Sequence, residues 1–154
     1  MLVKYGQGFS APIPLTMVDR VKTLQTEVSK MPQYEPLTEH IFHGGMYCRK
    51  VFREAGVLVV GKVHLFEHFY MIVSGTVIIT TDDGVVTIEG PELICSKPGT
   101  KRAVYALTDT MCMTFHRTDA TTVEDAEIEL VESDPDSQYL PGNVVRDNRI
   151  EVTL

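Results

Sequence analysis

The chain has 154 residues, which is enough for one domain with a hydrophobic core. Hydrophobic residues make up 44% and charged residues 23%, a composition that excludes a disordered protein. The net charge is −7, and ten of the acidic residues but only two basic ones fall within 119–154. Because no basic stripe with interleaved aromatic residues occurs, the composition also argues against a nucleic-acid-binding protein.

No apolar run in the sequence approaches the ~20 residues that are needed to cross a bilayer. The N-terminus lacks the basic start and the apolar stretch of a signal peptide. The three cysteines are odd in number and form no C-x-x-C pair, which favours free, buried thiols. We therefore expect a cytoplasmic protein that does not act at a membrane.

Residues 1–45 are expected to form an N-terminal arm, a helix and a first strand. Glycines and prolines predict an irregular arm over 1–15, and Thr16 followed by Asp19 resembles a helix capping box. Apolar residues then recur at helical spacing up to Pro32: Met17, Val21, Leu24, Val28 and Met31. A helix of about 15 residues is marginal alone, so we expect it to dock on the following domain or on a second subunit.

Short strand-like segments follow, rich in Val, Ile, Thr, Tyr and Phe and separated by turn signals. They cover residues 39–43, 46–53, 57–64, 68–73, 76–81, 85–89, 92–96, 102–107 and 110–117. Asp83-Gly84 predicts a hairpin. Many short strands at this pitch predict a β-sandwich or a barrel over 46–118. The acidic extension 119–154 is expected to lie mainly in solvent, with a short helix near 122–131. The end of this extension contains Val144-Val145 and the apolar residues of 150–152. We expect the extension to pack on the barrel or on a partner subunit.

The segment from Gly56 to Gly75 resembles the first motif of the cupin superfamily. That motif has Gly, five residues, His-x-His, three residues, Glu, six residues and Gly; Lys62, His64 and His68 stand at its three ligand positions. The spacing fits throughout, although two of these residue types differ. The resemblance implies a mostly β, cupin-type double-stranded β-helix, or jelly-roll barrel.

A second resemblance lies at Lys97-Pro98-Gly99, which is similar to the second cupin motif with Arg102 in place of its histidine. The wider pattern, including Thr38-Glu39-His40 and Thr114-Phe115-His116, resembles small uncharacterised cupin-domain proteins of tailed bacteriophages. This resemblance implies a phage or prophage origin, with the host cytoplasm as the location.

Cupins hold iron, manganese, nickel or zinc on three histidines and a glutamate. By resemblance, His64 keeps its ligand role and His68 replaces the glutamate, since neutral imidazole binds most first-row metals. We expect His116, on the last barrel strand beside the strand that starts at 68, to supply a third imidazole. Three protein ligands would leave an open position for catalysis.

Lys62 and Arg102 would oppose a divalent metal and favour an anionic ligand. The sequence therefore predicts ligand binding by Lys62, Arg102, Glu67 and Tyr70. The catalytic residues stay unassigned: by resemblance to metal-free sugar-nucleotide epimerases, His64 or His68 would act as a base, with Lys62 stabilising an oxyanion and Glu67 orienting the base.

Three functions remain open at this point. The first is a phage-type cupin that binds a small anionic ligand in a His-rich pocket, with or without a divalent metal. The second is a metal-dependent enzyme of the oxygenase or isomerase type, and the third is a phage structural or host-interaction module with a vestigial pocket. We also expect a homodimer that pairs through exposed sheet edges with exchanged arms. His40 and His43, which flank Gly44-Gly45, are expected at the surface.

Overall fold

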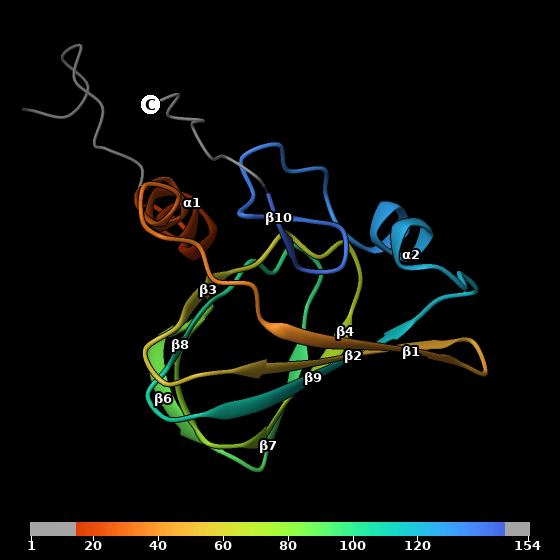
Figure 1. Cartoon of the computed structure of the whole chain (residues 1–154), viewed down its shortest axis with the longest axis horizontal. Coiled ribbons are helices and arrows are strands. Elements are labelled where there is room, and N and C mark those ends of the chain that lie inside the picture. Colours follow the sequence, from red (N-terminus) through yellow and green to blue (C-terminus); the bar gives the residue numbers. More distant parts are fainter. Residues whose placement is uncertain (1–14, 147–154) are drawn as a thin grey trace, which may run out of the picture.

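The computed structural model describes residues 15–146 and shows a mostly β protein with two short helices (Figure 1). The expected arm over 1–14 and the apolar end at 150–152 lie outside the described residues. Within the described part no helix is long and apolar enough to cross a membrane. The elements are α1 (Met17–Val28), β1 (Leu37–His43), β2 (Met46–Arg53), β3 (Leu58–Val60), β4 (His68–Ser74), β5 (Thr76–Thr81), β6 (Gly84–Glu89), β7 (Glu92–Ser96), β8 (Ala103–Ala106), β9 (Thr110–Arg117), α2 (Val123–Leu130), β10 (Tyr139–Leu140) and β11 (Val144–Val145).

Two antiparallel sheets face each other as a jelly-roll barrel. One has five strands in the order β1-β2-β9-β4-β7, and the other has four in the order β3-β8-β5-β6. Their inner faces meet in a core of buried side chains, which comprises Tyr70, Ile72, Val77, Ile79, Val104 and Cys112. The strand periodicity of the sequence and the Asp83-Gly84 hairpin between β5 and β6 are thereby confirmed.

The predicted strand over 57–64 is wrong in its second half. Only Leu58–Val60 forms a regular strand, and the chain then runs irregularly from Gly61 to Glu67. The Gly61 amide donates to the Arg102 carbonyl, and the Leu65 amide donates across to Leu130 in the C-terminal segment. Backbone groups of this stretch therefore bond to two different parts of the chain, which keeps it out of a single ladder.

Helix α1 begins at the predicted capping box. The Thr16 hydroxyl accepts from the Asp19 amide, and the Asp19 side chain accepts from the Thr16 amide. Val21 and Val28 pack against Val60 of β3 and against the β8 side of the barrel, so the helix docks on the barrel of its own chain. It ends at Val28, three residues earlier than the apolar stripe predicts.

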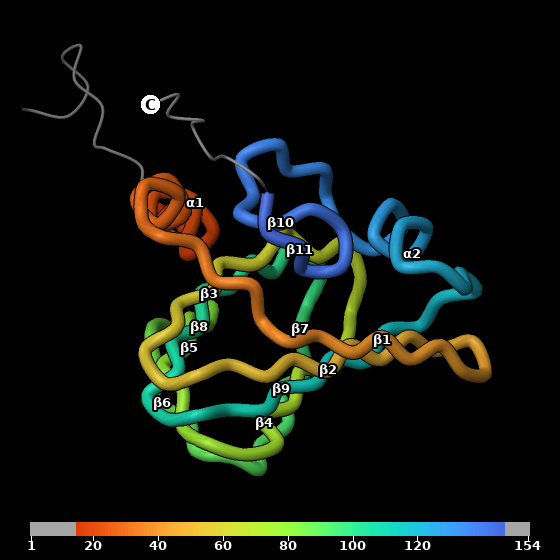
Figure 2. The backbone as a smooth tube through the Cα atoms, in the orientation of Figure 1, coloured from red at the N-terminus to blue at the C-terminus, as the bar shows by residue number. Residues whose placement is uncertain are grey.

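The segment 118–146 lies over the end of the barrel at which residues 61–65 pass (Figure 2). Ala126 and Leu130 of α2 pack against Tyr47 of β2. The Glu132 amide donates to the Val63 carbonyl at 2.8 Å, and the Gln138 side chain accepts from the Val60 amide at 3.0 Å. These contacts close one end of the barrel with the acidic part of the chain.

Candidate functional site: a cationic, histidine-lined barrel interior

The motif segment begins and ends at a glycine. Gly56 and Gly75 both have positive φ, +88° and +86°. A Cβ at Gly75 would lie 2.3 Å from the Asp109 carbonyl oxygen, so no other residue fits that turn. Between these glycines the chain delivers Lys62 and His64 to the barrel interior.

The three histidines named by the sequence come together. His64 lies on the irregular stretch, His68 begins β4, and His116 lies near the end of β9, which pairs with β4. Their ring centroids are 4.4 Å apart for His64–His68, 4.7 Å for His68–His116 and 5.5 Å for His64–His116. We call these three residues the histidine cluster.

Burial keeps this cluster neutral. Desolvation lowers the pKa of His64 well below its usual value, and neighbouring histidines lower it further. Desolvation also lowers the pKa of His68, and it brings the pKa of His116 down to about 3. All three imidazoles are therefore uncharged near neutral pH.

His68 has a defined orientation within the cluster. Its Nδ1 lies 3.1 Å from the Phe66 carbonyl oxygen, an acceptor, so Nδ1 carries the proton. Its Nε2 is therefore a lone-pair acceptor, and it is buried without a hydrogen-bond partner among the described residues. An oriented imidazole with a free Nε2 is the usual arrangement of a metal-ligating histidine.

The cluster fits a metal only in part. Its donor atoms are of the right chemistry, but within residues 15–146 no three His, Cys, Asp or Glu side chains converge in a geometry that could hold an ion. Binding a metal there would require the rings to rotate.

The barrel interior beside the histidine cluster is a cationic pocket. Its volume is about 90 Å³, which is the space of about three water molecules at ~30 Å³ each. A second lobe of about 60 Å³ adjoins it under the C-terminal segment and shares Lys62, His64 and Arg49. Polar side chains of the two lobes come from the five-stranded sheet, from the irregular stretch after β3, from the start of β8 and from the C-terminal segment: Arg49, Arg53, Lys62, His64, Tyr70, Arg102, Thr114, Glu127, Ser137, Tyr139 and Asn143.

Among the described residues, neither Arg53 nor Arg102 has a carboxylate within 4 Å, although Asp82 acts on Arg102 from farther away. The Arg53 side chain is 7% exposed and donates only to the Tyr70 hydroxyl, at 3.3 Å. Arg102 lies over the Tyr70 ring at 5.1 Å from its centroid, and the Nε atoms of both arginines are buried without partners. Burial raises the pKa of Tyr70 to about 12, so its hydroxyl keeps a proton that it can donate to a ligand.

Lys62, in contrast, is already paired. Glu127 of α2 accepts from Lys62 at 3.0 Å, from Arg49 at 2.7 Å and from the Gly142 amide at 3.0 Å. Burial would raise the pKa of Glu127, but Arg49, the Gly142 amide and Lys62 lower it below its usual value. The prediction that the acidic segment lies in solvent is therefore wrong at Glu127. Its carboxylate offsets the positive charge of Lys62 and Arg49 at the pocket.

Two further predictions about the site do not hold in the structure. Glu67 is exposed and lines none of the pocket, so the carboxylate beside the histidines is Glu127. His40 is half-buried, because the even-numbered residues of β1 point inward, and its Nδ1 forms a hydrogen bond with the Tyr47 hydroxyl. His43 is exposed, as expected. Cys95 is likewise exposed on β7, whereas Cys112 is buried.

Sequence reasoning missed Arg49, Arg53 and Glu127. Arg53 has a local signal, since strand alternation places it on the same face as Val51 and Tyr47, both of which are buried. Glu127 has none, because it reaches Arg49 and Lys62 from 78 and 65 residues away.

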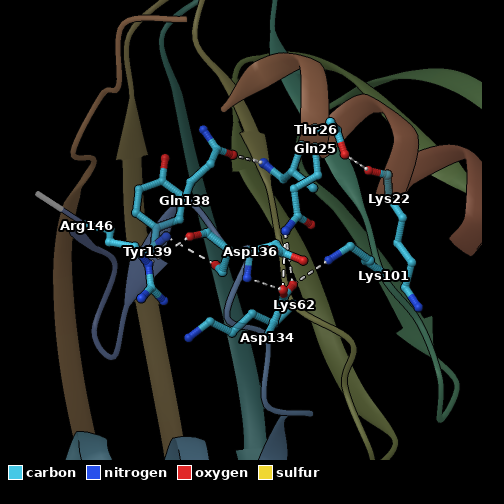
Figure 3. A network of polar contacts seen from close by, with 12 residues as sticks. Lys22, Gln25, Thr26, Lys62, Lys101, Asp134, Asp136, Gln138, Tyr139 and Arg146 are labelled. Carbon is cyan, nitrogen blue, oxygen red and sulfur yellow. Dashed lines mark hydrogen bonds and ion pairs between the residues drawn. The ribbon is translucent and has the colours of Figure 1, made fainter. Parts of the chain in front are cut away.

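A larger cleft of about 480 Å³ lies between α1 and the loop 132–138. Its polar groups largely pair with each other: Gln25 and Lys101 both donate to the Asp134 carboxylate, as Figure 3 shows. Lys101 is 1% exposed, and the Asp134 carboxylate also accepts from the Asp136 amide. This network ties α1, the barrel and the C-terminal segment together, so we assign it to stability.

No protein-family model and no curated protein matches the sequence. Among solved structures, KdgF from Halomonas sp. has a TM-score of 0.50 at 10% identity, over 57% of this chain and 84% of that one. A cupin superfamily protein from Desulfitobacterium hafniense reaches 0.49 at 15% identity, over 60% and 87%. Salicylate 1,2-dioxygenase from Pseudoaminobacter salicylatoxidans, complexed with gentisate, reaches 0.49 at 12%; the match covers 63% of this chain and 30% of that one. At 10% identity the likeness to KdgF concerns the fold alone: this chain has the cupin-type jelly-roll barrel, with an N-terminal helix packed against it.

Proposed function

We propose that this barrel binds a small organic anion, of the size of a mono- or dicarboxylate, in its cationic pocket. The observation that carries the proposal is a pair of arginines, the buried Arg53 and the half-buried Arg102, that line one pocket; among the described residues neither has a carboxylate within 4 Å. A buried charge without a partner costs several kcal/mol, and an anion bound between the two arginines would offset that cost.

The pocket also supports the size and the class of ligand. The two adjoining lobes, of about 90 and 60 Å³, suit a ligand of the size of malonate and are too small for a sugar nucleotide. The Tyr70 hydroxyl and the arginine N–H groups are donors that suit carboxylate oxygens. The neutral His64 at the edge of the pocket adds a group that could accept a proton from a bound ligand.

A scaffold with a vestigial pocket is the less favoured alternative. Replacing buried charges by apolar residues of similar volume is commonly neutral or stabilising. An unused interior would therefore gain from losing Arg53 and Arg102, whereas here both are present.

A divalent metal on the histidine cluster is a second candidate. The observation that favours it is the buried, unpartnered Nε2 of His68, held by the Phe66 carbonyl. A metal held there by His64, His68 and His116 would supply a Lewis acid near the anion pocket, which His64 also lines. A phage origin and an enzymatic activity stay predictions from the sequence.

Calorimetric titration with malonate, and with the isosteric but uncharged malonamide, tests the proposal. We expect malonate to bind and malonamide not to bind. Arg102→Met should lower the malonate affinity by about 10- to 100-fold, because it removes a charge-assisted hydrogen bond. Its matched control, Arg20→Met on the exposed side of α1, should leave the affinity unchanged.

The same titration separates the two candidates. Apo protein prepared with a chelator should still bind malonate if the arginines suffice. If malonate binds only after Zn²⁺ or Mn²⁺ is added, and His68→Ala removes this binding, the metal and not the pair of arginines binds the anion. Equal heats for malonate and malonamide, or Arg102→Met and Arg53→Met variants with full affinity, would rule out the anion pocket.

A further inference from the structure

A second cavity adjoins the cationic pocket on the side of the barrel. It has a volume of about 210 Å³ and lies between the ends of β5 and β7, beside Met17 and Val18 of α1. Within the described part of the chain it reaches the surface, because Asp82 and Asp83 of the β5–β6 turn are exposed and line it. We call this cavity the side chamber.

The inner wall of the side chamber consists of inward-facing positions on both sheets. Strand alternation places Thr81 of β5 on the same face as Val77 and Ile79, which are fully buried. On β7, Ile94 and Ser96 share the inward face, and the residue between them is exposed. Because Thr81, Ile94 and Ser96 all line the side chamber, it extends between the two sheets towards the barrel interior.

Two polar atoms at this wall are buried without a hydrogen-bond partner among the described residues. They are Ser96 Oγ and Arg102 Nε. Ser96 is 4% exposed and lies opposite His68 in the register of β7 and β4. Buried polar atoms without partners are costly, and a polar ligand that passes them would offset part of that cost. The wall therefore suits the passage of a polar ligand better than it suits apolar packing.

Arg102 separates the side chamber from the cationic pocket. It is the one residue that lines both cavities within the described part of the chain. Towards the interior, its guanidinium carbon lies 5.1 Å from the centroid of the Tyr70 ring, in a cation–π contact. Burial lowers the pKa of Arg102, whereas Tyr70 and Asp82 act in the opposite direction. The Arg102 guanidinium thus has one partner in the interior and a second, more distant one at the surface.

We propose that the side chamber is the portal through which a ligand reaches the cationic pocket. Arg102 closes this portal while it lies over Tyr70, and it opens the portal by turning towards Asp82. The turn breaks one cation–π contact and forms an ion pair in its place. The bound anion then meets Arg102 again from the inside, once the side chain has returned.

The end of the barrel under the C-terminal segment is the less favourable route. Opening that end would break at least three hydrogen bonds, those of Leu65 with Leu130, Glu132 with Val63 and Val60 with Gln138. Local openings that break fewer contacts are populated more often. A rotation of one half-buried arginine therefore admits a ligand more readily than the release of a whole segment does.

The inference rests on the proposed function for the ligand, but its test does not need the ligand to bind. Cys112 lines the cationic pocket and is 2% exposed, so a reagent must enter the barrel before it can alkylate this thiol. The rate of alkylation measures access whether or not malonate binds. Failure of the anion pocket and failure of the portal are therefore separate outcomes.

Alkylation by iodoacetamide, followed by peptide mass spectrometry, tests the portal. Cys95→Ser is the parent protein, because Cys95 is exposed and lines the side chamber. Thr81→Trp fills the chamber and should slow the alkylation of Cys112 at least 10-fold. Thr87→Trp, at an exposed position of β6, is the matched control and should react like the parent. Cys48 lines neither cavity, so its alkylation is the internal reference.

Asp82→Asn tests the movement of Arg102 with a substitution that keeps the shape of the side chain. It removes the carboxylate towards which Arg102 turns, so the alkylation of Cys112 should slow about 3- to 10-fold. Asp83→Asn, at the next residue of the same turn, is the matched control. It should react like the parent, because Asp83 does not act on Arg102.

Circular dichroism with urea unfolding verifies the fold of each variant, and Asp82→Asn decides the question if Thr81→Trp does not fold. A parent protein whose Cys112 reacts only as fast as the whole chain unfolds would overturn the proposal. So would a folded Thr81→Trp or Asp82→Asn variant that reacts like the parent. Faster alkylation in Gln138→Ala, with no effect of Thr81→Trp, would instead place the entry under the C-terminal segment.

Discussion

Burial decides the protonation state of the histidine cluster, and thereby its effect on stability. In the folded protein the pKa of His116 is about 3, mainly through desolvation, against an ordinary value near 6.5. Between these two values the unfolded chain binds more protons than the folded one. Stability therefore falls as the pH drops from about 6.5 towards 3, and it is fully retained above that window.

His116→Gln should remove part of this pH dependence. In chelator-treated protein, urea unfolding at pH 7 and pH 5 should show wild type losing about 2 kcal/mol more than the variant, as proton linkage at one such histidine requires. His43→Gln, at an exposed position, should lose as much as wild type. Identical losses in wild type and His116→Gln would mean that His116 is protonated as easily in the folded state as in the unfolded one.

At the residue scale, local sequence predicts more about which side chains enter the barrel than about their partners. The motif spacing brings Lys62, His64 and His68 to one interior. Nothing local, however, indicates that Glu127 neutralises Lys62, because the two meet only through the packing of α2 over the barrel end. The long-range ion pair thus changes Lys62 from a free cation into a paired one.

At the scale of elements, capping determines where α1 begins. The reciprocal bonds of Thr16 and Asp19 satisfy two amides of the first turn, and both residues can be identified from the sequence. The end of the helix depends on tertiary contacts: the Gln33 side chain donates to the carbonyls of Val28 and Met31, and it also accepts from Gln138. The apolar stripe alone therefore predicts a helix that ends at Met31, whereas α1 ends at Val28.

Thr16→Ala should lower the free energy of unfolding by about 1 kcal/mol, because it removes the N-cap acceptor. Urea unfolding followed by circular dichroism measures this. Thr23→Ala makes the same substitution at an exposed site within α1, where alanine favours the helix, and it should be neutral or slightly stabilising. Equal effects of the two substitutions would contradict the importance of the cap.

At the scale of the whole molecule, the C-terminal segment closes the end of the barrel beside the pocket. Gln138 is buried and bonds to both the Val60 amide and the Gln33 side chain, at 3.0 and 2.8 Å. It therefore links β3, the chain after α1 and the closing segment at one point. The pocket lobe beneath this segment is lined by Val60, Ser137 and Tyr139, which lie next to that link.

Gln138→Ala should loosen this closure without unfolding the barrel. Hydrogen exchange followed by NMR should show the amides of Val60 and Glu132 exchanging at least 10-fold faster, since one loses its acceptor and the other lies in the freed segment. The core amide of Ile79 should keep its protection. Ser133→Ala, at an exposed residue of the same segment, is the control, and unchanged exchange in Gln138→Ala would show that the segment is held by other contacts.

The sequence by itself determined most of the barrel strands, the N-terminal caps of the helices and the glycine turns, because alternation, capping and positive φ are properties of neighbouring residues. On these grounds it predicts a β-sandwich or barrel. The resemblance to the cupin motifs then implies the cupin type and names His64, His68 and His116, which the fold brings together. Only the tertiary structure decided that Arg53 and Arg102 line one pocket with no carboxylate of the described residues within 4 Å, and that Glu127 pairs with Lys62. These features join residues far apart in the chain, so they exist only once the sheets and the C-terminal segment have packed.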